Sequence, residues 1–81
     1  MTDEELHNHI EQLVAEEHAL REKEGRREEF EPEERVRLEE IQVSLDRCWD
    51  LLRQRRARRE AGLDPDDAKL RDADTVEHYR Q

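Results

Sequence analysis

Residues 38–52 read Leu-Glu-Glu-Ile-Gln-Val-Ser-Leu-Asp-Arg-Cys-Trp-Asp-Leu-Leu. Five apolar residues in this stretch are separated by steps of three and four: Leu38, Ile41, Leu45, Cys48 and Leu52. Such spacing is typical of a coiled-coil-like seam along one face of a helix. We therefore predict a long helix from about residue 32 to 61, with Trp49 flanking the seam.

Other apolar residues of this helix lie away from the seam. Val36 and Val43 fall almost opposite it on a helical wheel, and Leu51 falls well off it. Because one partner helix cannot cover both sides, we expect Val36 and Val43 to form a second contact surface, for a dimer mate or for the C-terminal segment. Trp49 is expected either in the core or as an anchor in an interface, where tryptophan often dominates the binding energy.

A second helix is predicted from about residue 3 to 24. Thr2 and Glu5 have the spacing of a capping box, and Gly25 suits the end of a helix. Four apolar residues of this helix fall within one narrow arc of the helical wheel: Leu6, Ile10, Leu13 and Leu20. Val14 lies at the edge of this apolar stripe, and Glu17 interrupts it.

The connection between the two helices decides their orientation. Residues 25–31 form a short connection, so the two helices are expected to be antiparallel neighbours. The long helix is expected to start at Pro32. Gly62 ends it in the manner of a glycine C-cap. The sequence thus predicts an all-α hairpin over residues 1–63 and a tail over residues 64–81, with a short helix at about 65–70.

The chain is short and highly charged. It has 81 residues, of which 32% are apolar and 48% charged, and Cys48 is its only cysteine, so no disulfide can form within it. One core of this size supplies only a few kcal/mol of stability, about 3–5 at most. We therefore expect two hairpins to dimerise through their apolar seams into a four-helix bundle.

Charge is unevenly distributed along the chain. The formal net charge is -9, and residues 1–34 alone carry 13 acidic against 4 basic side chains. Neither a signal peptide nor an apolar run long enough to span a bilayer is present in the sequence, which predicts a cytoplasmic protein with no membrane contact.

Basic residues gather in one short segment near the end of the long helix: Arg53, Arg55, Arg56, Arg58 and Arg59. The longer helix should overhang the start of the first one here, which places the arginines near Asp3 and just before Asp64. Three hypotheses follow: ion pairs within the chain or within an oligomer, an acidic protein partner, or the phosphates of a nucleic acid. The acidic net charge and the lack of interleaved aromatic residues count against nucleic acid.

Catalytic and metal sites are not predicted. One polar stripe of the first helix carries residue types that can ligate metals: Glu4, His7, Glu11 and His18. This stripe lies about 120° around the helix from the apolar stripe, whereas the metal ligands of helical bundles point into the core. Cys48 lies within the seam, where a thiol stays protonated. We expect no cofactor, no enzymatic activity, and a role as a protein–protein interaction or adapter module, with nucleic-acid association as the alternative.

One block of sequence resembles a known family. Residues 48–59, Cys-Trp-Asp-Leu-Leu-Arg-Gln-Arg-Arg-Ala-Arg-Arg, continuing through Asp64-Pro65 to residues 74–77, are similar to short actinobacterial proteins grouped as a domain of unknown function. The acidic opening segment with Glu16-Glu17-His18 resembles the same family. The resemblance covers nearly the whole chain and implies a free-standing cytoplasmic protein, but no activity or ligand.

Overall fold

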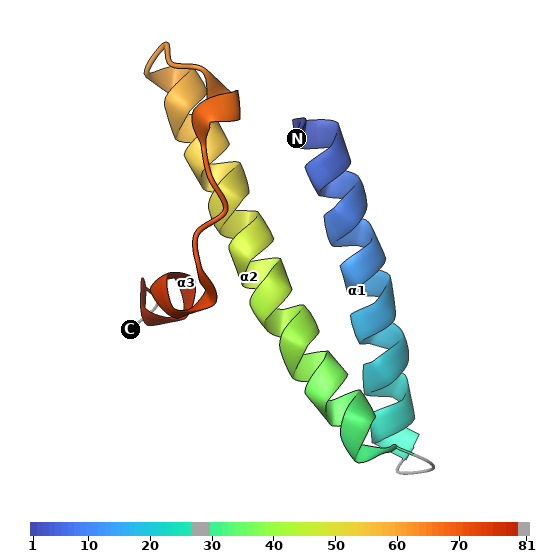
Figure 1. The fold of residues 1–81 in the computed structure, drawn as a ribbon. Coiled ribbons are helices and arrows are strands. Elements are labelled where there is room, and N and C mark those ends of the chain that lie inside the picture. Colours follow the sequence, from blue (N-terminus) through green and yellow to red (C-terminus); the bar gives the residue numbers. More distant parts are fainter. Residues whose placement is uncertain (27–29, 80–81) are drawn as a thin grey trace.

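The computed structural model of this chain describes residues 1–26 and 30–79. Its elements are two long helices followed by two short ones: α1 (Asp3–Arg26), α2 (Pro32–Glu60), the 3-10 helix η1 (Pro65–Asp67) and α3 (Ala73–Tyr79). Figure 1 shows α1 and α2 antiparallel and side by side, with the C-terminal segment returning along α2. The described residues contain no strand, and the predicted all-α hairpin with a short C-terminal helix is confirmed.

Helix α1 begins as its sequence predicts and ends slightly later. Glu5 N donates to Thr2 Oγ1 and Thr2 N donates to Glu5 Oε1, both at 3.1 Å, which is the reciprocal bonding of a capping box. Gly25 lies inside the last turn rather than beyond it, so the predicted end at residue 24 is two residues short. A glycine signals a helix end only where it takes up the left-handed conformation, and Gly25 does not.

Helix α2 has clear signals at both ends. Pro32 occupies the first turn, and Glu34 accepts a 3.1 Å hydrogen bond from the backbone N–H of Glu31. At the far end Gly62 has a φ of 76°, and Leu63 N donates to Arg58 O at 2.7 Å. This is a Schellman C-cap, which confirms the predicted role of Gly62.

The core lies between the two long helices. Leu6 and Ile41 are 1% and 0% exposed, and the cluster around them consists of Ile10, Leu13, Leu45, Cys48 and Leu51, with Leu20 and Leu52 packed against it and partly buried. Leu38 is buried as well. The predicted seam residues therefore pack within a single hairpin. Because these side chains are already covered in one chain, a second hairpin would have to contact other residues.

The pattern along α2 does not account for the burial of Leu51. The sequence places it well off the seam, yet it is buried in the core cluster, and Ala68 of the C-terminal segment packs against that cluster. Helical periodicity reports only which residues face a neighbouring helix. Leu51 is buried because the chain returns along α2, and Val76 of α3 is buried too, at 4% exposed.

The C-terminal segment differs in detail from the prediction. The helix expected at about 65–70 is only the single 3-10 turn of η1, begun by Asp64, whose Oδ1 accepts from Asp66 N at 2.9 Å. Two hydrogen bonds then fix the extended stretch before α3: Arg47 Nε donates to Arg71 O and Gln54 Nε2 to Lys69 O, both at 2.8 Å.

The side of α2 that carries Val36 and Val43 is only partly covered. Arg47 lies four residues after Val43 and so shares its side of the helix. Because Arg47 donates a hydrogen bond to Arg71 O, the C-terminal segment lies further along this same side of α2. Val36 remains 54% exposed. A second contact surface at Val36 and Val43 for another protein stays a prediction.

Among the residues that the structure describes, no helix has an apolar stretch that would cross a bilayer.

Candidate functional site: the Trp49 face

The arginine segment of α2 is divided by the fold into paired and unpaired side chains. Arg55 is 6% exposed and donates from Nε to Asp3 Oδ1 at 2.5 Å. Its Nη1 reaches Asp66 Oδ1 at 3.1 Å and Pro65 O at 3.2 Å. The guanidinium of Arg55 thus joins the start of α1, the end of α2 and η1. Its hydrogen bond to Asp3 raises the pKa of Arg55 above the ordinary value for arginine.

Two more arginines of this segment are engaged within the chain. Arg58 donates from Nε to Asp64 O at 2.6 Å, and its Nη2 lies 3.5 Å from Asp67 Oδ2. Arg59 Nη1 lies 2.9 Å from Asp3 Oδ2. The predicted overhang and its ion pairs within the chain are therefore confirmed for three of the five arginines.

Asp3 provides a test of this network through pH. The hydrogen bond from Arg55 lowers the pKa of Asp3 from its ordinary value of 3.8, and the charge of Arg59 adds to this. Since the folded-state pKa is depressed, the stabilisation is complete above the unfolded-state pKa and is lost as the pH falls through the folded-state value. We expect Asp3→Asn to be less stable than wild type at neutral pH and to lose less stability on acidification.

The measurement is urea unfolding at a series of pH values between neutral and about 2, the range over which carboxylates titrate. Glu4→Gln is the control, because Glu4 is the exposed neighbour of Asp3 and forms no ion pair with a described residue. Superimposable pH profiles for Asp3→Asn and wild type would show that Asp3 does not stabilise the fold.

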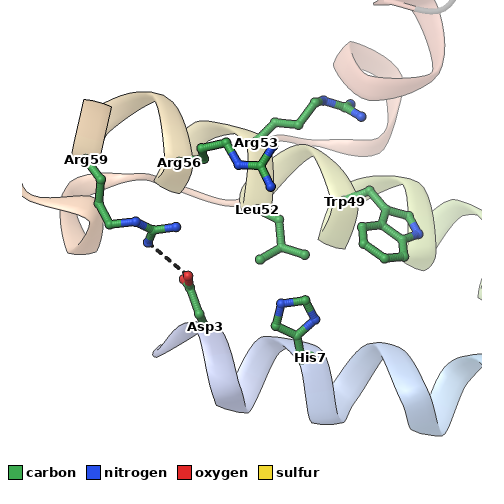
Figure 2. A pocket seen from close by; sticks show the side chains of 7 residues that line it. All are labelled: Asp3, His7, Trp49, Leu52, Arg53, Arg56 and Arg59. Carbon is green, nitrogen blue, oxygen red and sulfur yellow. Dashed lines mark ion pairs between the residues drawn. The ribbon is translucent and has the colours of Figure 1, made fainter. Parts of the chain in front are cut away.

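Arg53 and Arg56 differ from the other three arginines. Both are exposed, and neither side chain forms an ion pair or hydrogen bond with any residue within 1–26 and 30–79. They border a hollow of about 310 Å³ at the open end of the hairpin, together with Asp3, His7, Trp49, Leu52 and Arg59. Figure 2 shows Arg56 directed toward Leu52, and His7 of α1 facing Leu52 from the other helix.

Trp49 lies at the boundary between two regions of opposite charge. It is 42% exposed, so of the two environments expected for it, burial in the hairpin core is excluded. On one side it borders the hollow with the unpaired arginines, and on the other a hollow lined by Glu17, Gln42, Leu45 and Asp46. Cys48 points into the core, so the next residue along the helix turns about 100° away from it.

Val14 extends this surface onto α1. It is 45% exposed and lies two helical turns after His7, and therefore shares the side of α1 that faces the hollow. We define the Trp49 face as the surface formed by Val14, Glu17, Asp46, Trp49, Arg53 and Arg56. Its apolar centre has basic side chains toward the end of α2 and acidic side chains toward the middle of the molecule.

Sequence reasoning missed this face as a unit. Its signals are the position of Val14 at the edge of the stripe and Glu17 interrupting it, but these residues lie on a different helix from Trp49. Asp46, Trp49 and Arg53 also follow one another at steps of three and four, the spacing of a single helix face. Which faces of two helices meet on one side of a hairpin depends on how the helices pack.

Among the described residues, the candidate metal ligands do not gather into a site, and the candidate nucleophile Cys48 is buried. Within residues 1–26 and 30–79, no three side chains of the metal-ligating types are gathered closely enough to hold an ion. The Nε2 atom of His18 lies 3.2 Å from Oε1 of Glu22, and both side chains are exposed on α1. Cys48 is buried, and its burial raises the pKa of the thiol, which keeps it protonated at neutral pH.

Comparison with known proteins matches nearly the whole sequence of this chain to one family. The family model described as "Protein of unknown function (DUF2630)" matches residues 2–81. The uncharacterized protein Rv0898c of Mycobacterium tuberculosis is 53% identical over 78 residues, which cover 96% of this chain and 90% of the relative. The uncharacterized protein Mb0922c of Mycobacterium bovis has the same identity and coverage. No solved structure matches the chain.

Proposed function

This chain belongs to the DUF2630 family of unknown function, and we propose that it is a non-catalytic protein–protein interaction module of the cytoplasm that binds through the Trp49 face. The observation that carries the proposal is the exposed indole of Trp49 between basic and acidic side chains. Tryptophan combines a large apolar area with few rotatable bonds, and such residues contribute most of the energy in protein interfaces.

The surroundings of Trp49 support a protein partner. Arginine and tryptophan are both enriched at interface centres, and here Arg53 and Arg56 retain all their donors for a partner. A guanidinium forms paired hydrogen bonds with a carboxylate. An acidic or mixed-charge protein surface with an apolar residue among its carboxylates fits this arrangement.

The alternative, a nucleic-acid-associated protein, has weaker support. Arg55, Arg58 and Arg59 are held by aspartates and carbonyl groups of the chain itself, which leaves Arg53 and Arg56 as the unpaired guanidiniums of the segment. Two phosphate contacts would give a shallow salt dependence with a slope of about −2, and the net charge of -9 repels a polyanion. Sequence-independent binding by five arginines is therefore not the favoured hypothesis.

Capture from a native lysate separates these two functions. We expect tagged wild-type protein to retain protein partners, including untagged copies of the chain, after nuclease treatment. Changing Arg53 and Arg56 together to glutamate should abolish this retention. The matched control changes exposed Arg26 and Lys69 to glutamate, which alters the net charge by the same amount away from the Trp49 face.

Two results would contradict the proposal. Equal loss of binding in the control pair would mean that net charge alone governs retention. Loss of all retained material with nuclease, combined with steep salt dependence for purified single- or double-stranded nucleic acid, would favour the alternative function.

A further inference from the structure

We propose, as an extension of the protein-binding function, that the Trp49 face is occupied by a second copy of this chain, arranged antiparallel about a two-fold axis through Trp49. In such an interface the same patch serves both copies, so each residue i that contacts residue j is matched by j contacting i. The face must therefore be complementary to itself in charge and in shape.

The order of charges along α2 meets this requirement. Asp46 lies three residues before Trp49 and Arg53 four residues after it, so the antiparallel arrangement sets Arg53 of one copy beside Asp46 of the other. Arg56 lies seven residues after Trp49 and Gln42 seven before it. The second hollow, lined by Gln42 together with Glu17, would thus receive Arg56 of the second copy.

The same charges decide against a parallel dimer. Two α2 helices running in the same direction about Trp49 would place Arg53 opposite Arg53 and Asp46 opposite Asp46. Like charges set opposite each other at an interface are costly. The orientation that the sequence alone leaves open is therefore fixed by the position of Asp46, Arg53 and Arg56 around Trp49.

The position of Trp49 along α2 suits extensive contact. The helix runs from residue 32 to 60, so its midpoint is residue 46 and Trp49 lies only three residues beyond it. Two antiparallel copies centred on Trp49 are displaced by about 9 Å along a helix about 44 Å long, so most of each helix faces its mate. The two indoles meet near the axis, where offset or edge-to-face packing of aromatic rings is favourable.

The flat shape of the molecule leaves this face accessible. The principal extents are 51 × 27 × 16 Å, and the broad side exceeds the roughly 800 Å² that each partner contributes to a standard interface. The C-terminal segment bonds to Arg47, Gln54 and Arg55, which leaves Trp49 and Arg56 exposed. Val14 and Trp49 then supply the apolar centre of the contact.

A charge-exchange experiment on purified protein tests the arrangement. One variant carries Arg53→Glu and Arg56→Glu, and the other Glu17→Lys and Asp46→Lys. Each variant alone would set like charges opposite each other in an antiparallel dimer. Mixed together, they restore opposite charges at both symmetry-related contacts. At one contact the introduced glutamates meet the introduced lysines, and at the other the native arginines meet the native acidic residues.

The association state is measured by sedimentation equilibrium at protein concentrations up to about 100 μM. This range detects dimers with dissociation constants in the micromolar range. We expect wild type to dimerise, each variant to be at least tenfold weaker, and the equimolar mixture to recover a dimer of mixed composition. Far-UV circular dichroism confirms that both variants retain the hairpin. Monomeric wild type, or variants that dimerise as wild type does, would overturn the inference, and so would a mixture that stays monomeric.

The outcomes also separate this inference from the proposed function. A wild type that is monomeric, yet retains another protein from the lysate through Arg53 and Arg56, overturns the second-copy arrangement and leaves protein binding intact. A wild type that retains no protein at all, its own copy included, overturns both.

Discussion

Replacing Arg55 by alanine is expected to lower the free energy of unfolding by about 2–3 kcal/mol, because three charge-assisted hydrogen bonds are lost together. Each such bond contributes about 1.5–3 kcal/mol in favourable cases, but here the aspartates regain water once the arginine is removed. Asp66 is 69% exposed and Asp3 36% exposed in their side chains, so the total is well below the sum of three bonds.

The measurement is chemical unfolding followed by far-UV circular dichroism at one fixed protein concentration, since dimerisation would make stability depend on concentration. Lys69→Ala is the matched control, because it also removes one positive charge, from an exposed side chain, and should change stability by less than about 0.5 kcal/mol. Arg55→Lys should fall in between, since lysine keeps the charge but not the planar fork. Equal midpoints for Arg55→Ala and Lys69→Ala would show that Arg55 does not hold the three elements together.

Replacing Ile41 by alanine is expected to cost about 3–4 kcal/mol, which is within the usual range for deleting a fully buried branched side chain. Ile41 is 0% exposed and lies in the cluster that joins α1 to α2. Native domains are commonly stable by only about 5–15 kcal/mol, and short chains lie toward the lower end. The variant should therefore be partly unfolded at temperatures where wild type is folded.

A graded series tests the packing argument. Ile41→Val should cost about 0.5–1.5 kcal/mol, because one methylene group is removed from the same position. Val36→Ala is the exposed counterpart on the same helix; Val36 is 54% exposed, and alanine is the better helix former, so the change should be near zero or slightly stabilising. Similar losses for Ile41→Ala and Val36→Ala, measured by thermal unfolding, would contradict the assignment of the core to the seam.

The hairpin and its seam were predictable because they depend on local pattern. Steps of three and four along residues 38–52 place Ile41 and Leu45 on one face, and the short connection leaves only an antiparallel return. The capping residues Thr2 and Gly62 likewise act on neighbouring amides and carbonyls. These features need no knowledge of where distant segments lie.

What the sequence does not reveal concerns residues whose environment is set by a distant part of the chain. Leu51 is buried because the C-terminal segment returns along α2, and no periodicity within α2 announces that return. Trp49 is less buried than its neighbours because the packing of α1 leaves this side of the hairpin open. Sequence also ranks the five arginines as equals, whereas the fold buries Arg55 and leaves Arg53 and Arg56 unpaired.

A dimer centred on Trp49 would present two copies of the remaining apolar surface. Val36 and Val43 lie on α2 together with Glu39, Glu40 and Ser44, well away from Trp49 around the helix. Self-association through the Trp49 face therefore leaves this surface exposed on both chains. In this arrangement one face joins the copies and another remains for further proteins.

Fluorescence of the single tryptophan tests the central claim most directly. Trp49 is 42% exposed in one chain, so acrylamide should quench its emission readily at high dilution. We expect quenching to weaken and the emission to shift to shorter wavelength as the wild-type concentration rises, while Asp46→Lys stays quenched throughout. Quenching that is the same at every concentration, and the same in wild type and Asp46→Lys, would show that no second copy covers Trp49.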